Sequence, residues 1–248
     1  MCESQSKRNN MPKAEQTENL PAVLDFSVDS GKGFDTVDSS DFGVPILKVL
    51  QKLSPAVDEI EEAKEGDFYI GQVGRVFSGS EGLSVVPSYY KKIWAIWTPR
   101  DLGGGYQGEL AFDDPIAKET KQVGMKRVLD NGDELVETVN WYLTIISDDM
   151  PMRVLLPMTS TQLRTSRKFI SLSAGLKMKD ANGSLYTPPM FSHIYRLTTQ
   201  KESNNKGSWY TMNLVLEGPI QDSIVYEQTK EFYDIAKNLG GQTQMLEA

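Results

Sequence analysis

The residues best suited to chemistry lie between positions 85 and 108, in the stretch VVPSYYKKIWAIWTPRDLGGGYQG. Aromatic rings and cations alternate there: Tyr89, Tyr90, Trp94, Trp97 and Tyr106 stand among Lys91, Lys92 and Arg100. Such rings can stack on nucleic-acid bases, at about 1–3 kcal/mol per base, while lysine and arginine neutralise phosphates. The same rings could fill a hydrophobic core, so the stretch by itself leaves both interpretations open.

The order of residues in this stretch gives it two mixed faces if it is a β-strand, because successive side chains point to opposite sides. One face receives Val85, Pro87, Tyr89, Lys91, Ile93, Ala95 and Trp97, and the other receives Val86, Ser88, Tyr90, Lys92, Trp94, Ile96 and Thr98. A sheet with one buried face would separate the rings from the lysines. We therefore predict that each face is partly buried and partly open, with Trp94 and Trp97 on opposite faces.

A second group of cations lies between residues 153 and 206. This segment is rich in lysine and arginine but contains only Asp180 and Glu202 as acids, although the whole chain has a net charge of −8. Its candidate phosphate contacts are Arg164, Arg167, Lys168 and Arg196. The asymmetry favours a local surface that faces a polyanion; the alternative is ordinary solvated charge.

Patterns for catalysis or metal binding are scarce. The chain has one histidine, His193, and one cysteine, Cys2, which excludes an internal disulfide and a cysteine-based metal site. The glycines at 103–105 lack the lysine and the helix of a phosphate loop and are expected to let a loop bend. The pairs Asp113–Asp114 and Asp148–Asp149 leave a metal-dependent nuclease as a third alternative. We predict a non-enzymatic protein without a metal or cofactor.

Hydrophobic periodicity predicts mainly β-structure with two helices. Strands are expected at 67–79, 81–100, 135–146, 150–158, 190–200 and 207–218, and helices at 159–178 and 222–241. Thr159 or Ser160 can cap the first helix, and Asp222 can cap the second. The strands do not alternate with helices as in parallel βαβ units, so the class is α+β, with an antiparallel barrel or sandwich and attached helices.

The length of 248 residues suits one large domain or two small ones. We expect a polar, flexible arm at 1–42, a β domain at 43–220 and a C-terminal helix with a short tail at 221–248. The N-terminus lacks the apolar segment of a signal peptide, and no run of about 18 apolar residues could span a membrane. A single cysteine fits a reducing cytosol, so we expect a cytoplasmic protein.

Four short segments together resemble single-stranded DNA-binding proteins of tailed bacteriophages. The segments, within residues 44–217, are PILKVLQKLSP, GDFYIGQVG, VVPSYYKKIWAIWTPRDLGGG and PMTSTQLRTSRKF. This resemblance implies an OB-fold core, a role in DNA replication and recombination, and Tyr89, Trp94, Trp97 and Arg100 near a nucleic-acid groove. Such proteins often end in an acidic tail that recruits partners. This chain ends GGQTQMLEA instead, which leaves its acidic N-terminal arm as the substitute.

Two functional hypotheses follow. The first is sequence-tolerant binding of single-stranded DNA in the host-cell cytoplasm, with phage replication or recombination proteins as further partners and a homo-oligomer left open. The second is a phage structural or assembly protein, in which the same aromatic residues form a subunit interface, where tyrosine and tryptophan are also enriched.

Overall fold

The computed structural model describes residues 27–33, 35, 43–124, 126–147, 151–205 and 207–239. The chain divides into two compact units, Met1–Val37 and Asp38–Ala248. In the first unit the described residues include a 3-10 turn at Ser27–Asp29. The rest of the predicted arm and the predicted tail after residue 239 lie outside the described residues. Every element named below belongs to the second unit.

The described part of the second unit is mainly β-structure, which confirms the predicted class and both predicted helices. Its strands are β1 (Leu47–Val49), β2 (Phe68–Ile70), β3 (Arg75–Phe77), β4 (Leu83–Trp97), β5 (Tyr106–Ala111), β6 (Lys121–Val123), β7 (Lys126–Val128), β8 (Glu134–Ile146), β9 (Met152–Thr159), β10 (Met178–Lys179), β11 (Leu185–Tyr186), β12 (His193–Asn204) and β13 (Gly207–Pro219). Its α-helices are α1 (Pro55–Glu59), α2 (Leu163–Gly175) and α3 (Ser223–Asn238). The apolar run at 44–55 contains β1 and leads into α1.

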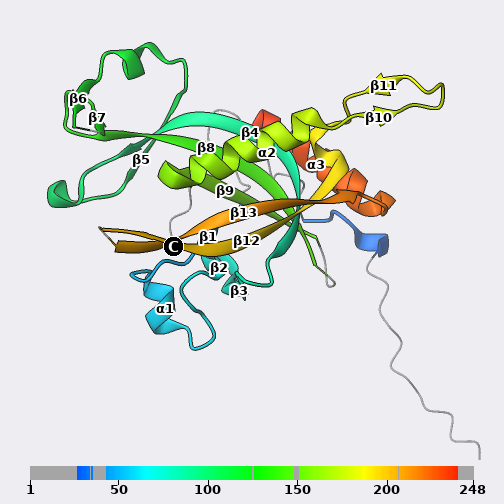
Figure 1. The fold of residues 1–248 in the computed structure, drawn as a ribbon, viewed down its shortest axis with the longest axis horizontal. Helices are drawn as coiled ribbons and strands as arrows, with labels where there is room; N and C mark the ends of the chain where they lie inside the picture. Colours follow the sequence, from blue (N-terminus) through cyan, green and yellow to red (C-terminus); the bar gives the residue numbers. More distant parts are fainter. Residues whose placement is uncertain are drawn as a thin grey trace, which may run out of the picture. The chain divides into compact units, whose positions relative to one another are not determined.

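The strands form antiparallel sheets that stay open (Figure 1). The large sheet has the order β13-β12-β4-β8-β7-β6, with β5 beside β4 and β9 beside β8; β1, β2 and β3 form a small sheet. One bridge joins Ile46 to Leu155, and the Thr199 N–H donates to the Gly79 carbonyl (2.8 Å). At these two places the parts of the chain that carry the two sheets are joined by single contacts and not by continuous hydrogen-bonded ladders. The described strands therefore form no closed barrel, and the predicted OB-fold-like barrel is not confirmed.

A β-bulge divides β4 into two parts. The register between β4 and β8 shifts between Pro87 and Tyr89, and the extra residue of a bulge interrupts strict alternation. Val85 before the bulge and Tyr90 after it therefore pack with the same core cluster, although strict alternation puts them on opposite faces. The predicted grouping of Val85 and Pro87 with Tyr89 is thus wrong, whereas alternation holds from Tyr89 to Trp97.

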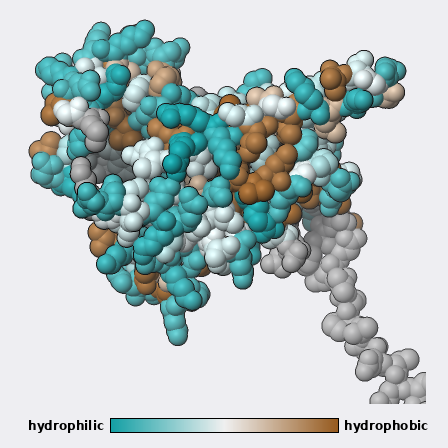
Figure 2. All heavy atoms as spheres, in the orientation of Figure 1, coloured by the Kyte–Doolittle hydropathy of each residue, from teal (hydrophilic) through white to brown (hydrophobic). Residues whose placement is uncertain are grey.

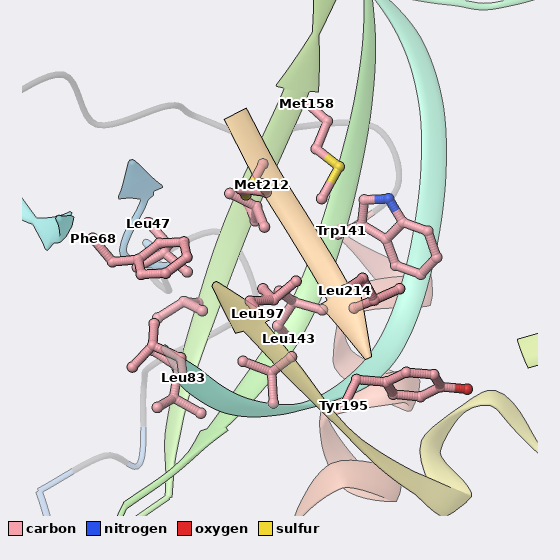
Figure 3. Packing of buried hydrophobic residues seen from close by; sticks show 14 of the residues in the cluster. Leu47, Phe68, Leu83, Trp141, Leu143, Met158, Tyr195, Leu197, Met212 and Leu214 are labelled. Atoms are coloured by element: carbon pink, nitrogen blue, oxygen red, sulfur yellow. The ribbon is translucent and has the colours of Figure 1, made fainter. Parts of the chain in front are cut away.

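The main core lies between the large sheet, the small sheet and α2. Its buried side chains come from strands of both sheets and from Phe169 of α2, and Figure 3 shows how they point toward one another. Trp141 stacks on Phe169, with ring centroids 4.1 Å apart and planes at 14°. The Trp141 Nε1–H donates to Ser166 Oγ (2.9 Å), so the one polar group of this buried ring has a partner. This cluster joins the two sheets to the helix.

Side chains cover the outer edge of β13, the last strand of the large sheet. An uncovered edge would present unpaired backbone groups to other chains. The Gln51 side chain accepts from the N–H of Tyr210 (2.8 Å) and donates to its carbonyl (3.0 Å). Thr165 donates to the carbonyl of Met212 and Lys168 to the carbonyl of Leu214 (2.7 Å each). Lys168, a predicted phosphate contact, therefore bonds to a sheet edge.

The two long helices begin differently. Asp222 caps α3 as predicted, because its carboxylate accepts from the backbone N–H groups two and three residues later (2.7 and 3.4 Å). Phe232 of α3 then packs on Tyr142 of the large sheet. α2 is shorter than the predicted 159–178, because Ser160–Gln162 form a 3-10 turn whose first residue has a left-handed φ of 50°.

His193 begins β12 and is only 6% exposed. Its burial makes the free energy of unfolding depend on pH. Its Nδ1 lies 2.7 Å from Ser192 Oγ, and burial lowers the pKa of the ring below its ordinary 6.5. The unfolded chain therefore binds a proton more readily than the folded chain, and stability falls as the pH drops below 6.5.

We expect the urea midpoint to be lower at about pH 5.5 than at about pH 7.5. Because the chain has one histidine and carboxylates titrate mostly at lower pH, His193→Gln should remove most of the difference. A difference of unchanged size in that variant would contradict the assignment to His193.

Candidate nucleic-acid interface

The predicted aromatic stretch lies on a ribbon formed by residues 89–97 of β4, residues 134–142 of β8, and β5, β6 and β7. We call its two sides the α2 face and the α3 face, after the helix that each side meets. Tyr90, Lys92 and Trp94 lie on the α2 face, and Tyr89, Lys91, Trp97 and Tyr106 lie on the α3 face. Trp94 and Trp97 thus lie on opposite faces, as predicted.

Trp94, on the α2 face, belongs to a buried cluster. It is 8% exposed and stacks on Phe112, with ring centroids 5.1 Å apart and planes at 12°. Its Nε1–H donates to the Phe112 carbonyl (3.2 Å), and the Arg127 guanidinium lies 5.0 Å from the ring. Trp94 is therefore a packing residue, and the more exposed ring at this place is Phe112, at 39%.

The α2 face also borders a groove of about 230 Å³ between the ribbon and α2. Tyr90 contributes to its lining and packs edge-on against Trp141, with centroids 5.2 Å apart. Lys92 contributes as well, but its ammonium pairs with Glu137 (2.7 Å). Arg167 of α2 is exposed in this groove, and no carboxylate pairs with it among the described residues. Of the charges here, Arg167 is the cation that remains available.

The α3 face is closed near the helix. Tyr89 packs between Tyr142 and Tyr233, with ring centroids 5.9 and 6.0 Å away. Lys91 pairs with Glu109 (2.5 Å), and both side chains are largely buried, at 16% and 10% exposure. Burial and the ion pair with Glu109 leave the Lys91 ammonium little access to solvent. Tyr89 therefore serves packing, and Lys91 balances the charge of Glu109.

Farther along the α3 face, Trp97 and Arg100 border an open hollow of about 490 Å³. Its lining residues are Trp97, Thr98, Pro99, Arg100, Asp101, Lys126, Glu134 and Val136. Trp97 is half-buried and meets Tyr106 edge-to-face, with centroids 5.4 Å apart. Arg100 is exposed, and no carboxylate pairs with it among the described residues. A predicted ring and a free cation thus line one open surface here, as Tyr90 and Arg167 do in the groove beside α2.

Tyr106 packs beside Trp97 from the neighbouring strand β5. Burial, and then the nearby Glu109 carboxylate, raise the pKa of Tyr106 to about 12. Its hydroxyl is buried without a hydrogen-bond partner in the described part of the chain. The phenol thus stays neutral at ordinary pH. Its edge-to-face contact with Trp97 keeps the indole ring in position.

The glycines after Arg100 shape the turn that exposes it. Gly103, Gly104 and Gly105 have φ values of 110°, 71° and 116°, a region that side chains disfavour. The Gly104 N–H donates to the Pro99 carbonyl (3.0 Å), and the Gly105 carbonyl accepts from Thr98 (2.9 Å). The three glycines therefore fold the chain back on itself, as the predicted bend requires.

The remaining predicted cations lie away from the ribbon's aromatic rings. Arg164 pairs with Glu202 (2.5 Å), and Arg196 pairs with Glu217 (2.6 Å). Acids from outside the basic segment also neutralise two further cations, in the pairs Arg153–Glu231 and Lys201–Glu65. Four cations of the basic segment at 153–206 are therefore neutralised in three dimensions, whereas Arg167 stays open beside the ribbon.

Three contributors to the ribbon were missed from the sequence: Phe112, Lys126 and Arg127. Phe112 directly follows strand β5, in a part of the chain between residues 100 and 135 for which no strand was predicted. The alternation of Gly108, Leu110 and Phe112 in GELAF was the available signal.

Other chemistries find little support in the described residues. Among them, no group of three His, Cys, Asp or Glu side chains could hold a metal ion. The Asp114 carboxylate caps a 3-10 turn by accepting from the Ile116 N–H (2.9 Å), and Asp148–Asp149 lie outside the described residues. No described helix is both long and apolar enough to cross a membrane.

Residues 13–242 match the sequence model of the Pam3 phage gp34-like protein family. This range is most of the 248-residue chain. No curated protein and no solved structure matches the chain significantly. The prediction of a bacteriophage protein family is thus confirmed, whereas membership of a single-stranded DNA-binding family and DNA binding itself stay predictions.

Proposed function

This chain belongs to the Pam3 phage gp34-like protein family, and from that premise we propose that it binds single-stranded DNA without sequence preference during phage DNA replication or recombination. The observation that carries the proposal is the Trp97–Arg100 hollow. A half-buried indole and an unpaired guanidinium border one open surface there. Base stacking on aromatic rings and phosphate neutralisation by arginine are the two interactions that sequence-tolerant binding uses.

The bound strand would place a base against Trp97 and a phosphate beside Arg100. Trp97 is held in position by Tyr106, so little side-chain freedom is lost when a base stacks on it. Lys126 lies in the same hollow and already pairs with Glu134 (2.5 Å), which lowers its expected contribution. The resemblance of the segment from Trp97 to Gly105 to phage single-stranded DNA-binding proteins supports the same assignment. The setting is the host-cell cytoplasm.

A titration with oligo(dT), with tryptophan fluorescence as the signal, tests the proposal. We expect quenching that weakens as salt rises, because neutralised phosphates release counterions. Arg100→Ala should weaken binding and reduce the slope of log affinity against log salt by about 0.7, the value for one phosphate contact on a single strand.

Lys230→Ala is the matched control, since it removes one exposed cation on α3, far from the hollow in sequence. It should leave the slope unchanged. Absence of quenching at low salt, or equal slopes for the two variants, would contradict the proposal. A discrete oligomer that buries Trp97 and ignores DNA would instead support the assembly-protein hypothesis.

A further inference from the structure

The β10–β11 hairpin projects from the second unit with little support of its own. It extends past the end of α2 and away from the sheets (Figure 1). Leu185 is 67% exposed and Tyr186 is 43% exposed, and Figure 2 shows hydrophobic atoms on this projection at the upper right. Asp180 Oδ1 holds the turn by accepting from the N–H groups of Asn182 and Ser184 (2.9 Å each). A two-stranded hairpin is marginal in water, so its apolar side chains suit a contact with another surface.

The charges of the hairpin define the chemistry of that surface. Lys177 and Lys179 are exposed, and neither pairs with a carboxylate among the described residues. The one acid of the hairpin, Asp180, accepts at Oδ1 from two backbone N–H groups of the turn, and the two lysines leave the hairpin with a net positive charge. A surface that receives this hairpin should therefore combine an apolar contact with several unpaired carboxylates.

A surface of this composition lies around α1, which we call the acidic lobe (residues 53–62). Its exposed carboxylates are Asp58, Glu59, Glu61 and Glu62, and no cation pairs with them among the described residues. Leu53 in the same lobe is 92% exposed. A small buried cluster of Leu50, Ala56 and Ala63 holds the lobe together. The carboxylates are thus presented outward on a supported segment.

We propose that the β10–β11 hairpin of one copy docks on the acidic lobe of a second copy. Figure 1 places the hairpin and α1 at opposite ends of the second unit, so they cannot meet within one chain. Contact between two different surfaces of identical chains is heterologous, and its repetition gives a ring or a row of subunits. Lys177 and Lys179 would face the carboxylates, and Leu185 would cover Leu53. This contact requires no DNA and stands independently of the proposed function.

Paired charge reversals test the contact in the absence of DNA. The hairpin variant is Lys177→Glu with Lys179→Glu, and the lobe variant is Glu59→Lys with Glu62→Lys. Each should weaken self-association at least about tenfold, because like charges placed together across an interface cost several kcal/mol. When the two variants are mixed, both contacts regain opposite charges and association should return. The measurement is sedimentation equilibrium over a range of protein concentrations at low salt.

The control is Lys118→Glu with Lys230→Glu, which changes the net charge as much as the hairpin variant does at other exposed positions. It should associate like the unaltered chain. Leu185→Ser should weaken association without any change of charge. The proposal is overturned if the unaltered chain stays monomeric at all concentrations, or if mixing the two reversed variants restores nothing. Loss of DNA binding in Arg100→Ala would leave every one of these results unchanged.

Discussion

Trp94→Ala and Trp97→Ala are expected to damage different properties of this protein. Trp94 is buried against Phe112 and donates to its carbonyl, so its loss leaves a cavity and should lower the free energy of unfolding by about 3 kcal/mol. Trp97 borders the open hollow beside Arg100. Its loss should weaken oligo(dT) binding by about 1–3 kcal/mol, which is roughly 5- to 150-fold.

Urea unfolding and oligo(dT) titration on the same preparations separate the two effects. Trp97→Phe is the matched control, because it keeps an aromatic ring in the hollow and should retain most of the affinity. Binding is measured at a temperature well below the unfolding transition of Trp94→Ala, so that unfolding of this variant is not mistaken for a loss of affinity. Equal effects of both alanine variants on both properties would contradict the division of the ribbon into a packed and an open ring.

Trp141→Ala should be the most destabilising single change, at about 3–5 kcal/mol. The ring is fully buried, stacks on Phe169 and meets the edge of Tyr90. Its removal also leaves Ser166 Oγ without its donor, and an unpaired buried polar group adds about 1–3 kcal/mol. The large sheet and α2 thus lose a contact that joins them.

Chemical denaturation measures this effect as a lower midpoint with an unchanged slope. Val215→Ala, at a position on β13 that is 56% exposed, should change the unfolding free energy by less than about 0.5 kcal/mol. A Trp141→Ala protein that unfolds at the midpoint of the unaltered chain would show that the core does not depend on this ring.

The parts of the fold that follow from local pattern were predictable. β4 and β8 are long and rich in β-branched and aromatic residues, and Asp222 is a strong helix cap, so these elements were found within a few residues. The bulge near Ser88 has one local signal, Pro87, because proline inside a sheet is confined to edges and bulges. The prediction from strict alternation did not use it. The expected barrel was not confirmed, because closure depends on distant strands and these are joined here only through single contacts.

The candidate site was predictable to the same extent. Alternation put Trp94 and Trp97 on opposite faces, but which ring stays open depends on Phe112, which arrives 18 residues after Trp94. Lys91 was predicted to contact phosphate, but in the structure it pairs with Glu109 of β5. The basic segment likewise meets its acids only in three dimensions, as Arg196 meets Glu217. Charge counts along the chain do not contain these pairings.

The covering of the β13 edge has a consequence for how the chain can fold during synthesis. β13 is the last of the described strands to leave the ribosome, and the side chains that bond its outer edge, Gln51, Thr165 and Lys168, all precede it. Its inner neighbour β12 is also complete before it. The strand therefore emerges when both of its sides already have partners, and its edge need not be exposed to a neighbouring nascent chain.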